Sequence, residues 1–401
     1  MRILVLGLGV PFPPHGGGLT RTYHLLKSLA SQHHVTLAAF TYGEPFEEPP
    51  YPLELLRVPW AWSSDYLAMN GPDAAAAQRA YHRLTFEDDQ PWFTSVMDAA
   101  AMEDTLTRAL RNGVDLVVLE GTPMARFLPI IPTEVPRVLD FFDIHSVMAD
   151  RLIVSAGDNR NAVVRDAERT LAFERDAARR CNMCLAVSDQ DAAAARALLG
   201  ARAVEVVPNG VDTVYFRPDD RLPAADTLLF TGRMNYPPNA EAARHFAEHV
   251  LPLIHRDIPG ATFHIVGAAP PPQVSGLASP SVIVHGRVDD MREHLWGAAL
   301  TVVPILSGGG TRLKVLEAAA CGKAIVSTPL GVEGLGLHGD RDVLVADSAQ
   351  TFADAVVALL RDPARRTALG RNAHTAAGRF DWASIGASFR AIIERAATDR
   401  A

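Results

Sequence analysis

The chain has little cysteine, almost no lysine and no long apolar run. Its three cysteines, Cys181, Cys184 and Cys321, are too few and odd in number for a disulfide framework. No run of about 18 apolar residues occurs, and three prolines interrupt the apolar opening segment before it reaches the length of a secretory signal. These absences exclude a disulfide-stapled module and a helix that spans a membrane. We therefore expect a cytoplasmic protein with no integral membrane segment.

Excess positive charge is also missing. The sequence has 46 acidic and 38 basic residues, a net charge of −8, which argues against a nucleic-acid partner and against an anionic lipid surface. A small-molecule substrate fits this balance better. With 401 residues, 48% of them hydrophobic, the chain exceeds one ordinary core and predicts two domains.

Short apolar runs alternate with alanine-rich helical patterns, which is typical of βαβ units and parallel sheets. In the first half we expect strands at Ile3–Leu6, Val35–Phe40, Leu116–Leu119, Arg137–Phe141 and Cys184–Val187. In the second half we expect them at Thr227–Thr231, Thr262–Val266, Ser281–His285, Leu300–Val303, Ala324–Ser327 and Asp342–Val345. Residues 44–90 are rich in proline and aromatics, and we expect loops and helices there. The pattern predicts an α/β protein with two doubly wound, Rossmann-like domains that face each other across a cleft.

A glycine-rich segment from residue 304 to residue 328 carries the strongest functional signal. Gly308, Gly309 and Gly310 have no Cβ, so the backbone there can turn sharply and bring its N–H groups against a ligand. A helix expected to start near Thr311 would direct unpaired N–H groups and the positive end of its dipole towards phosphate oxygens. The segment therefore predicts a diphosphate site.

Charged residues follow these glycines. Arg312 and Lys314 would add positive charge in the first helical turn. Glu317 lies six residues after Thr311, about 9 Å along a helix axis, within reach of a sugar hydroxyl attached to the phosphates. A tight turn with solvated basic residues is the alternative. Because the chain has only two other lysines, a specific role for Lys314 is favoured.

Seven short motifs occur in order along the chain. They are Gly16-Gly17-Gly18, AVSDQD at 186–191, VVPNGVD at 206–212, FTGRM at 230–234, VHGRVDD at 284–290, the glycine loop with Glu317, and FDWASI at 380–385. Each motif is weak alone. Together, in this order and spacing, they resemble the retaining glycosyltransferases of family 4, which have the GT-B fold, over nearly the whole chain. The nearest pattern is a subgroup whose GGGTRLK-x-x-E loop lacks the first of two glutamates.

The resemblance implies that the two domains bind different substrates. Residues 1–207 would bind the acceptor, residues 208–380 would bind the nucleotide-sugar donor, and residues 381–401 would form a C-terminal helix that packs back on the N-terminal domain. The implied donor-binding residues are Gly16, Gly17, Gly18, Arg233, Arg287, Val288, Gly309, Gly310, Thr311, Arg312, Leu313, Lys314 and Glu317. By the same resemblance, Arg233 would pair with the diphosphate, main chain near Arg287 and Val288 would read the nucleobase, and Glu317 would bind the ribose.

Three departures from the family pattern concern the site itself. Gly309 stands eight residues before Glu317, where the family usually has a glutamate that holds the hydroxyls of the transferred sugar. Pro238 stands where a phosphate-binding lysine is common, and we expect Lys314 or Arg312 to compensate. Glu120 ends the strand after which many relatives place a histidine.

The position facing the transferred sugar in the N-terminal domain is therefore open. Besides Glu120, the residues Asp143 and His145 follow the next strand. Any of the three would suit a sugar hydroxyl, and the sequence does not choose between them.

The implied activity is retaining transfer of a sugar from a nucleoside-diphosphate sugar to an acceptor hydroxyl, with the leaving phosphate taking the acceptor's proton. The implied catalytic residues are Arg233, Lys314, Glu317, Glu120 and His145. No metal and no cofactor beyond the nucleotide-sugar co-substrate is expected, and the acceptor would be a small molecule, a glycan or a lipid-linked group. The alternatives are a nucleotide-sugar epimerase of the same fold and a non-catalytic nucleotide-sugar-binding protein.

Other motifs favour structural explanations. His245-Phe246-Ala247-Glu248-His249 matches the inverted zinc-peptidase pattern H-x-x-E-H, but it lies on a helix whose apolar stripe explains it better. The D-x-D at residues 340–342 is expected in a solvated surface loop. Cys181 and Cys184 are expected to be buried thiols. The glycines at residues 7 and 9 lack the third glycine of a dinucleotide fingerprint, and Trp60 and Trp62 suit an aromatic anchor at least as well as a sugar-stacking surface.

Overall fold

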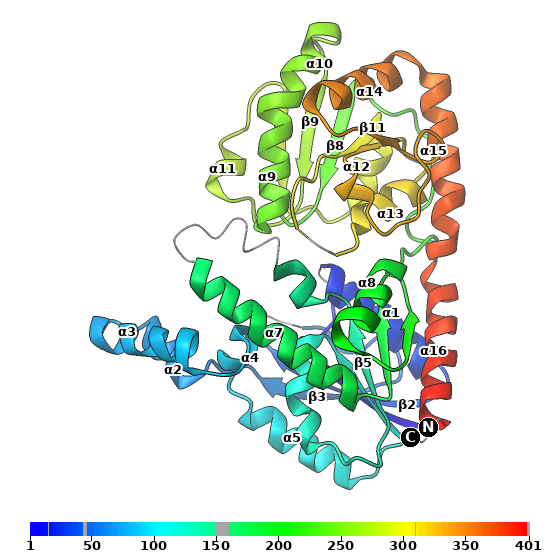
Figure 1. The fold of residues 1–401 in the computed structure, drawn as a ribbon. Helices are drawn as coiled ribbons and strands as arrows, with labels where there is room; N and C mark the ends of the chain where they lie inside the picture. The colour runs from blue at the N-terminus through cyan, green and yellow to red at the C-terminus, as the bar shows by residue number, and fades with distance from the viewer. Residues whose placement is uncertain (15, 43–45, 150–159, 309, 399–401) are drawn as a thin grey trace. The chain divides into compact units, whose positions relative to one another are not determined.

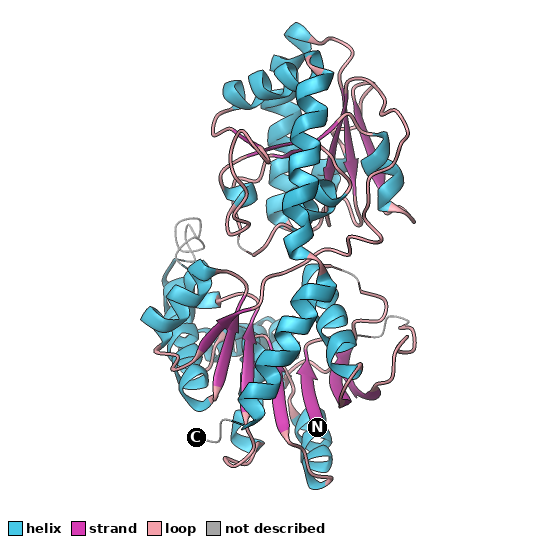
Figure 2. Cartoon of the chain, turned by 90° about the vertical axis from the view of Figure 1, so that its right-hand side faces the viewer, coloured by secondary structure: helices cyan, strands magenta, loops and turns pink. Residues whose placement is uncertain are grey.

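The computed structural model describes residues 1–14, 16–42, 46–149, 160–308 and 310–398. The chain divides into two compact units. The N-terminal unit comprises Met1–Pro208 and Ile385–Ala401, and the C-terminal unit comprises Asn209–Ser384. Each unit contains one parallel sheet with helices on its faces (Figures 1 and 2).

The sheet of the N-terminal unit has seven strands in the order β3-β2-β1-β4-β5-β6-β7. The strands are β1 (Arg2–Gly7), β2 (His34–Thr41), β3 (Glu54–Pro59), β4 (Leu116–Glu120), β5 (Arg137–Phe141), β6 (Met183–Ala186) and β7 (Val204–Val206). All neighbouring pairs are parallel. The chain starts in the middle, moves outward through β2 and β3, and returns to the other side of β1 with β4. The switch point between β1 and β4 is where ligands of open α/β sheets bind, at the carboxyl ends of the strands.

Helices of this unit are α1 (Gly17–Ala30), α2 (Ser64–Met69), α3 (Ala74–His82), α4 (Trp92–Ser95), α5 (Ala100–Arg111), α7 (Arg160–Arg180), α8 (Asp189–Ala194) and most of α16 (Trp382–Thr398). Shorter helical turns lie at Arg83–Glu87, Thr122–Ile130 and Ala195–Leu199. The central strands are apolar on both faces because helices cover both: every residue of β4 is buried. The helix α16 is tied to this unit by contacts of His33 with Glu394 and of Arg395 with Glu205.

The C-terminal unit has six parallel strands in the order β10-β9-β8-β11-β12-β13. They are β8 (Thr227–Thr231), β9 (Thr262–Val266), β10 (Val282–Gly286), β11 (Leu300–Val303), β12 (Ile325–Ser327) and β13 (Leu344–Val345). The helices are α9 (Pro237–His245), α10 (Leu251–Asp257), α11 (Pro272–Ser275), α12 (Met291–Gly297), α13 (Leu313–Ala320), α14 (Ala349–Arg361) and α15 (Pro363–Ala377). Helical turns lie at Phe246–Val250, Leu330–Val332 and Gly378–Phe380. The switch point here lies between β8 and β11.

The expected α/β class with two doubly wound domains is confirmed, and four strands have the predicted bounds: β5, β8, β9 and β11. The expectation of only loops and helices in residues 44–90 is wrong, because β3 pairs in parallel with β2 from Glu54 to Pro59. The strand β7 was also not predicted. Both are edge strands with few buried residues, so the apolar signal that reveals central strands is weak in them.

Candidate functional site

The C-terminal unit brings the predicted donor residues to the carboxyl end of its sheet, at the switch point. Gly232 and Arg233 follow β8 directly, and Ser307 to Gly310 follow β11. Since β8 and β11 are neighbours, the turn after one strand and the glycine loop after the other lie at the same edge. This is the edge at which an open α/β sheet offers a crevice to a ligand.

The glycine loop needs its glycines for two reasons. Gly308 and Gly310 have φ values of 89° and 76°, which side chains rarely tolerate. A Cβ on Gly308 would also lie 2.8 Å from Cγ of Pro238 and 3.0 Å from the hydroxyl of Tyr236. The loop therefore packs closely on the start of α9. Gly309, also predicted to bind the donor, lies outside the described residues.

The side chain of Arg312 folds back onto the glycine loop. Its Nη1 donates to the carbonyl of Gly310 at 2.8 Å, its Nη2 donates to the carbonyl of Gly308 at 3.0 Å, and the residue is buried. The guanidinium thus closes the loop from within while it keeps its positive charge. Helix α13 starts at Leu313, two residues after Thr311, near which its start is predicted. Arg312, with φ −84° and ψ 81°, is the non-helical residue before the helix.

Lys314 lies in the first turn of α13 and reaches back to the end of β8. Its Nζ donates to Oδ1 of Asn239 at 2.7 Å and lies 5.0 Å from the centre of the Phe230 ring. A Cβ on Gly232 would lie 3.1 Å from this Nζ, so the ammonium sits directly against the backbone that follows the strand. Loss of hydration, with repulsion from Arg312, lowers the pKa of Lys314 to about 7.

Asn239 was not predicted as a site residue. It is buried, at 6% exposed, and its Nδ2 donates to the carbonyl of Arg233 at 2.8 Å while its Oδ1 accepts from Lys314. One amide therefore joins the turn after β8 to helix α13. Nothing in the sequence PPNAEA indicates this bond, because it depends on the packing of α9 beside α13.

Arg233 itself is exposed, and Glu317 lies one turn after Lys314 on α13. Burial raises the pKa of the Glu317 carboxyl to about 7, against the attraction of Lys314. Arg287 and Val288 follow β10, where Gly286 has a φ of 72°. They lie at the same sheet edge but two strands away from β8.

A second bond ties the glycine loop to α9. Oγ of Ser307 donates to Oε2 of Glu241 at 2.6 Å. Glu241 is a half-buried carboxylate that sequence reasoning also missed. It lies two helix positions beyond Asn239, so the first half of α9 supports both the lysine and the loop.

The carboxyl end of the N-terminal sheet has a different character. Glu120 ends β4, is buried, and accepts a hydrogen bond from Oγ1 of Thr22 at 2.9 Å. Its neighbour in register on β5 is Asp140, which forms a buried two-bond pair with Arg21 at 2.8 and 2.9 Å. Burial, together with repulsion from Asp140, raises the pKa of Glu120 to about 8. Burial therefore favours the protonated form of Glu120.

His145 lies beyond the end of β5 and is half-buried. The backbone N–H groups of His145 and Ser146 donate to the carboxylate of Glu174 at 2.8 and 3.1 Å, and Oγ1 of Thr122 donates to it at 3.0 Å. Burial lowers the pKa of the His145 imidazole, although Glu174 and Asp166 oppose this. The buried Glu174 on α7 thus holds the backbone that carries His145, and sequence reasoning missed it.

The predicted glycines 16 to 18 lie at the exposed start of α1. Gly16 has a φ of 89° and precedes the helix, whose first turn has no acidic residue. A Cβ on Gly18 would meet no atom within 4 Å. These features leave the helix N-terminus open to an anion. Glu120, Asp143 and His145 share the carboxyl edge of this unit, and their order of importance stays a prediction.

The remaining motifs have structural roles. The rings of His245 and His249 meet edge-on, with their centres 5.2 Å apart, beside the buried Phe246 and Val250. The expectation of a solvated D-x-D is wrong for Asp342, which is 2% exposed and accepts the backbone N–H of His338 at 3.0 Å. The three cysteines are buried and unpaired as thiols. Within the described residues, no group of His, Cys, Asp or Glu is arranged to hold a metal ion, and no helix has the length and apolarity needed to cross a membrane.

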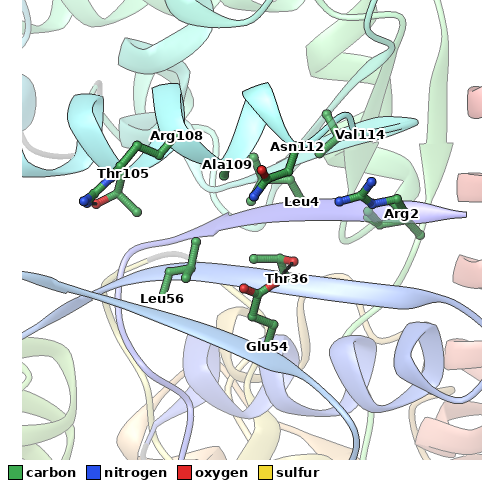
Figure 3. Close-up of a pocket in the computed structure, with 11 residues that line it drawn as sticks. Arg2, Leu4, Thr36, Glu54, Leu56, Thr105, Arg108, Ala109, Asn112 and Val114 are labelled. Carbon is green, nitrogen blue, oxygen red and sulfur yellow. Dashed lines mark hydrogen bonds between the residues drawn. The ribbon is translucent and has the colours of Figure 1, made fainter.

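A cavity of about 280 Å³ lies in the N-terminal unit away from the predicted site residues (Figure 3). It is bordered by the strands β1, β2 and β3 and by helix α5, and residues such as Arg2, Thr36 and Asn112 line it. Its strand residues lie towards the amino ends of the strands. This places it at the edge opposite to Glu120.

The fold agrees with comparisons to known proteins. Residues 225–362, which lie in the C-terminal unit, match the model of the family described as Glycosyl transferases group 1. The chain is similar to D-inositol 3-phosphate glycosyltransferase of Frankia alni, with 30% identity over 208 residues, which are 45% of this chain and 50% of the relative. The chain thus spans about half the length of the curated relatives it matches.

Solved structures match over the whole chain. Sucrose-phosphate synthase from Thermosynechococcus elongatus superposes with a TM-score of 0.71 at 16% identity, covering 98% of this chain and 99% of that one. HepE of Anabaena in complex with UDP and glucose superposes with a TM-score of 0.67 at 16% identity, covering 98% and 99%. The architecture is therefore the GT-B fold, with its two doubly wound domains.

Proposed function

We propose that the protein is a retaining glycosyltransferase that moves a sugar from a nucleoside-diphosphate sugar to an acceptor hydroxyl. The observation that carries this proposal is the site of the C-terminal unit, where the glycine loop, the loop-closing Arg312 and the Lys314 ammonium meet at the sheet's switch point. The glycosyltransferase group 1 match covers these residues. The named activities of the relatives and the UDP and glucose bound to HepE support the same class.

Transfer of the sugar is favoured by positive charge at the place where the diphosphate leaves. The bond between the anomeric carbon and the phosphate oxygen breaks, and negative charge gathers on the diphosphate. Cations fixed there lower the barrier when they stabilise the departing group more than the bound donor. We assign this role to Lys314 and Arg233, with Arg312 shaping the loop. Lys314 would thereby replace the lysine that Pro238 displaces.

The acceptor hydroxyl attacks the face from which the phosphate leaves, and its proton passes to the leaving phosphate oxygen. No enzymic base is then required. We assign the ribose to Glu317, the nucleobase to the main chain near Arg287 and Val288, and part of the diphosphate to Gly16 to Gly18. Glu120 or His145 is proposed to hold the transferred sugar, because Gly309 replaces the glutamate expected in the loop. We propose that the reaction needs no metal ion.

Thermal unfolding with uridine, guanosine, adenosine and thymidine diphosphates, in the presence of a chelator, tests the donor site. A ligand at about 100 times its Kd stabilises the fold by roughly 2.7 kcal/mol, which shifts the melting temperature measurably. One base should stabilise the protein clearly more than the others. If no nucleotide does so, with or without added divalent cation, the donor assignment fails.

The non-catalytic binder is the second candidate, because the loop lacks the carboxylate that the family uses for the sugar. A positive nucleotide shift followed by no hydrolysis and no transfer, over a wide panel of sugars and acceptors, would favour it. Release of free nucleoside diphosphate from one donor favours the transferase. Conversion of a donor to a second nucleotide sugar without acceptor would favour the epimerase.

A further inference from the structure

Lys314 is held in place by neutral groups. Its Nζ donates to the amide oxygen of Asn239 and faces the ring of Phe230, and within the described residues no carboxylate lies within ion-pair distance of it. An ammonium has three N–H donors. One is used by Asn239, so the others remain for a ligand at the glycine loop.

The hydrogen bonds of the Asn239 side-chain amide determine which of its two ends faces Lys314. Its Nδ2 donates to the carbonyl of Arg233, which cannot donate back, so its Oδ1 is the end that faces Lys314. The residue is 6% exposed, and a Cβ on Gly232 would lie 2.8 Å from its Nδ2. The contact is therefore built into the packing of α9, the end of β8 and α13.

A carboxylate in place of this amide would have changed the site. It would pair with Lys314 and hold the lysine protonated, but it would also cancel the charge and bring an anion beside the phosphates. Asparagine orients the lysine without either effect. The other charges near Lys314 are Arg312, which repels a proton, and Glu317, which attracts one.

The free site therefore holds a poorly hydrated lysine, and this loss of hydration is the main cause that lowers its pKa to about 7. Two negative phosphates would supply the opposite charge that the protein leaves out, and they would favour the protonated form.

We propose that Asn239 is a positioning residue that orients Lys314 without neutralising it, and that a nucleoside diphosphate entering this site causes Lys314 to take up a proton. The proposal rests on the proposed function, since it assigns the diphosphate to this loop. It goes further by making donor binding depend on pH through one named amine.

Calorimetric titration of the full chain at pH 8 tests this directly. Each of the four nucleoside diphosphates is titrated in two buffers that differ in ionisation enthalpy, and the difference in heat gives the protons taken up. The terminal phosphate, with a pKa of about 6 as in other phosphate monoesters, is already ionised at this pH. The wild type should take up close to one proton at pH 8 and clearly fewer at pH 6.5. Lys314→Met should bind more weakly and take up none.

Two variants of Asn239 test whether this residue orients Lys314 or only fills space between the helices. Asn239→Asp should weaken nucleotide binding at least tenfold and abolish most of the proton uptake, because its Lys314 is already protonated. Asn239→Ala should also weaken binding but should keep the uptake. Thermal unfolding of each variant without ligand shows whether it is folded.

The outcomes distinguish this inference from the proposed function. If the wild type binds a nucleoside diphosphate with heats that do not depend on the buffer, the proton uptake is wrong while the donor site stands. If Asn239→Ala binds as tightly as the wild type, the positioning role is wrong, and if Asn239→Asp does so, the need for an uncharged partner is wrong. If the wild type binds none of the four nucleotides, the donor assignment itself is wrong. The wild-type measurement decides the first point even if a variant fails to fold.

Discussion

The carboxyl edges of the two sheets differ in how their charged side chains are paired. At the N-terminal edge, Arg21 is used inside the protein by Asp140 and by the carbonyls of Val207 and Pro208. The nearby Glu120 is buried, which raises its pKa to about 8. At the C-terminal edge, Lys314 hydrogen-bonds the amide of Asn239 and pairs with no carboxylate in the part of the chain that the structure describes. Two sheets with the same topology thus offer a nearly neutral, hydrogen-bonding edge and a positive one. The first suits sugar hydroxyls, and the second suits a diphosphate.

Breaking the internal pair of the N-terminal edge should have the largest effect. Arg21→Met leaves Asp140 buried without its partner, which typically costs about 3–5 kcal/mol of unfolding free energy. Arg395→Met, which breaks the exposed pair with Glu205, is the matched control and should cost less than about 1 kcal/mol. Urea unfolding measures both. Equal losses in the two variants would show that the Arg21 pair is not structural.

The protonation of Lys314 should matter for binding rather than for folding. Lys314→Met removes a charge-assisted contact with the donor, worth about 1.5–3 kcal/mol of binding free energy. Its unfolding free energy should stay the same or rise, since a poorly hydrated ammonium is removed. Lys27→Met, at an exposed lysine of α1, is the control for charge alone. A loss of stability in Lys314→Met without loss of nucleotide affinity would contradict the assignment.

The two edges should also differ in their pH dependence. Glu120 has a folded pKa of about 8 against a model-peptide value of 4.5, so the folded state binds more protons than the unfolded state between these values. Its stabilisation is present at low pH and is lost as pH rises, by about 2 kcal/mol between pH 5.5 and 7. Lys314 has the opposite sign: its lowered pKa means that stability rises with pH between about 7 and 10.5.

Hydrogen exchange followed by mass spectrometry at several pH values reads the two units separately. In Glu120→Gln the fall in protection of β1 and β4 with rising pH should be smaller than in the wild type. Peptides from β8 and β11 should respond to Lys314→Met instead. An unchanged pH profile of β4 in Glu120→Gln would mean that Glu120 is ionised in the folded protein.

The smallest effect is expected at the histidine group of the C-terminal unit. His264 and His285 share a hydrogen bond of 3.0 Å, and partial loss of hydration lowers the pKa of both, with repulsion from His285 and His294 acting on His264 and repulsion from His294 acting on His285. Protonation then favours the unfolded state, so stability is lost as pH falls through about 6.5. His285→Gln should reduce this loss in urea unfolding measured at pH 7 and pH 5.5. A steeper loss in the variant would contradict the repulsion between the two rings.

Sequence patterns predicted the buried strands well, because both faces of a parallel sheet are covered and the residues form continuous apolar runs. Strand β5 was predicted to the residue, whereas the edge strand β3 was hidden by its polar outward residues. The glycine loop was predicted because consecutive glycines allow a sharp turn of the backbone. Lysine is also rare in this chain, which favours a specific role for Lys314. Helix α13 starts two residues after Thr311 because Arg312 bonds back to the loop carbonyls instead of joining the helix.

Asn239, Glu241 and Glu174 could not be predicted in the same way. Each acts through a partner that is distant in sequence: Asn239 and Glu241 reach residues 75 and 66 positions away, and Glu174 holds residues 28 and 29 positions before it. Their residue types are also common on ordinary helices. Only the packing of one helix against another strand or loop shows what they bind.

We propose that the C-terminal edge binds the diphosphate of a sugar donor through Lys314. Phosphorus NMR of a mixture of uridine-, guanosine-, adenosine- and thymidine-diphosphate sugars, with chelator present, follows the release of each free diphosphate. The wild type should release one of them, and Lys314→Met, folded to the same extent, should release it at least tenfold more slowly. Equal rates in the two proteins would show that Lys314 does not act on the diphosphate.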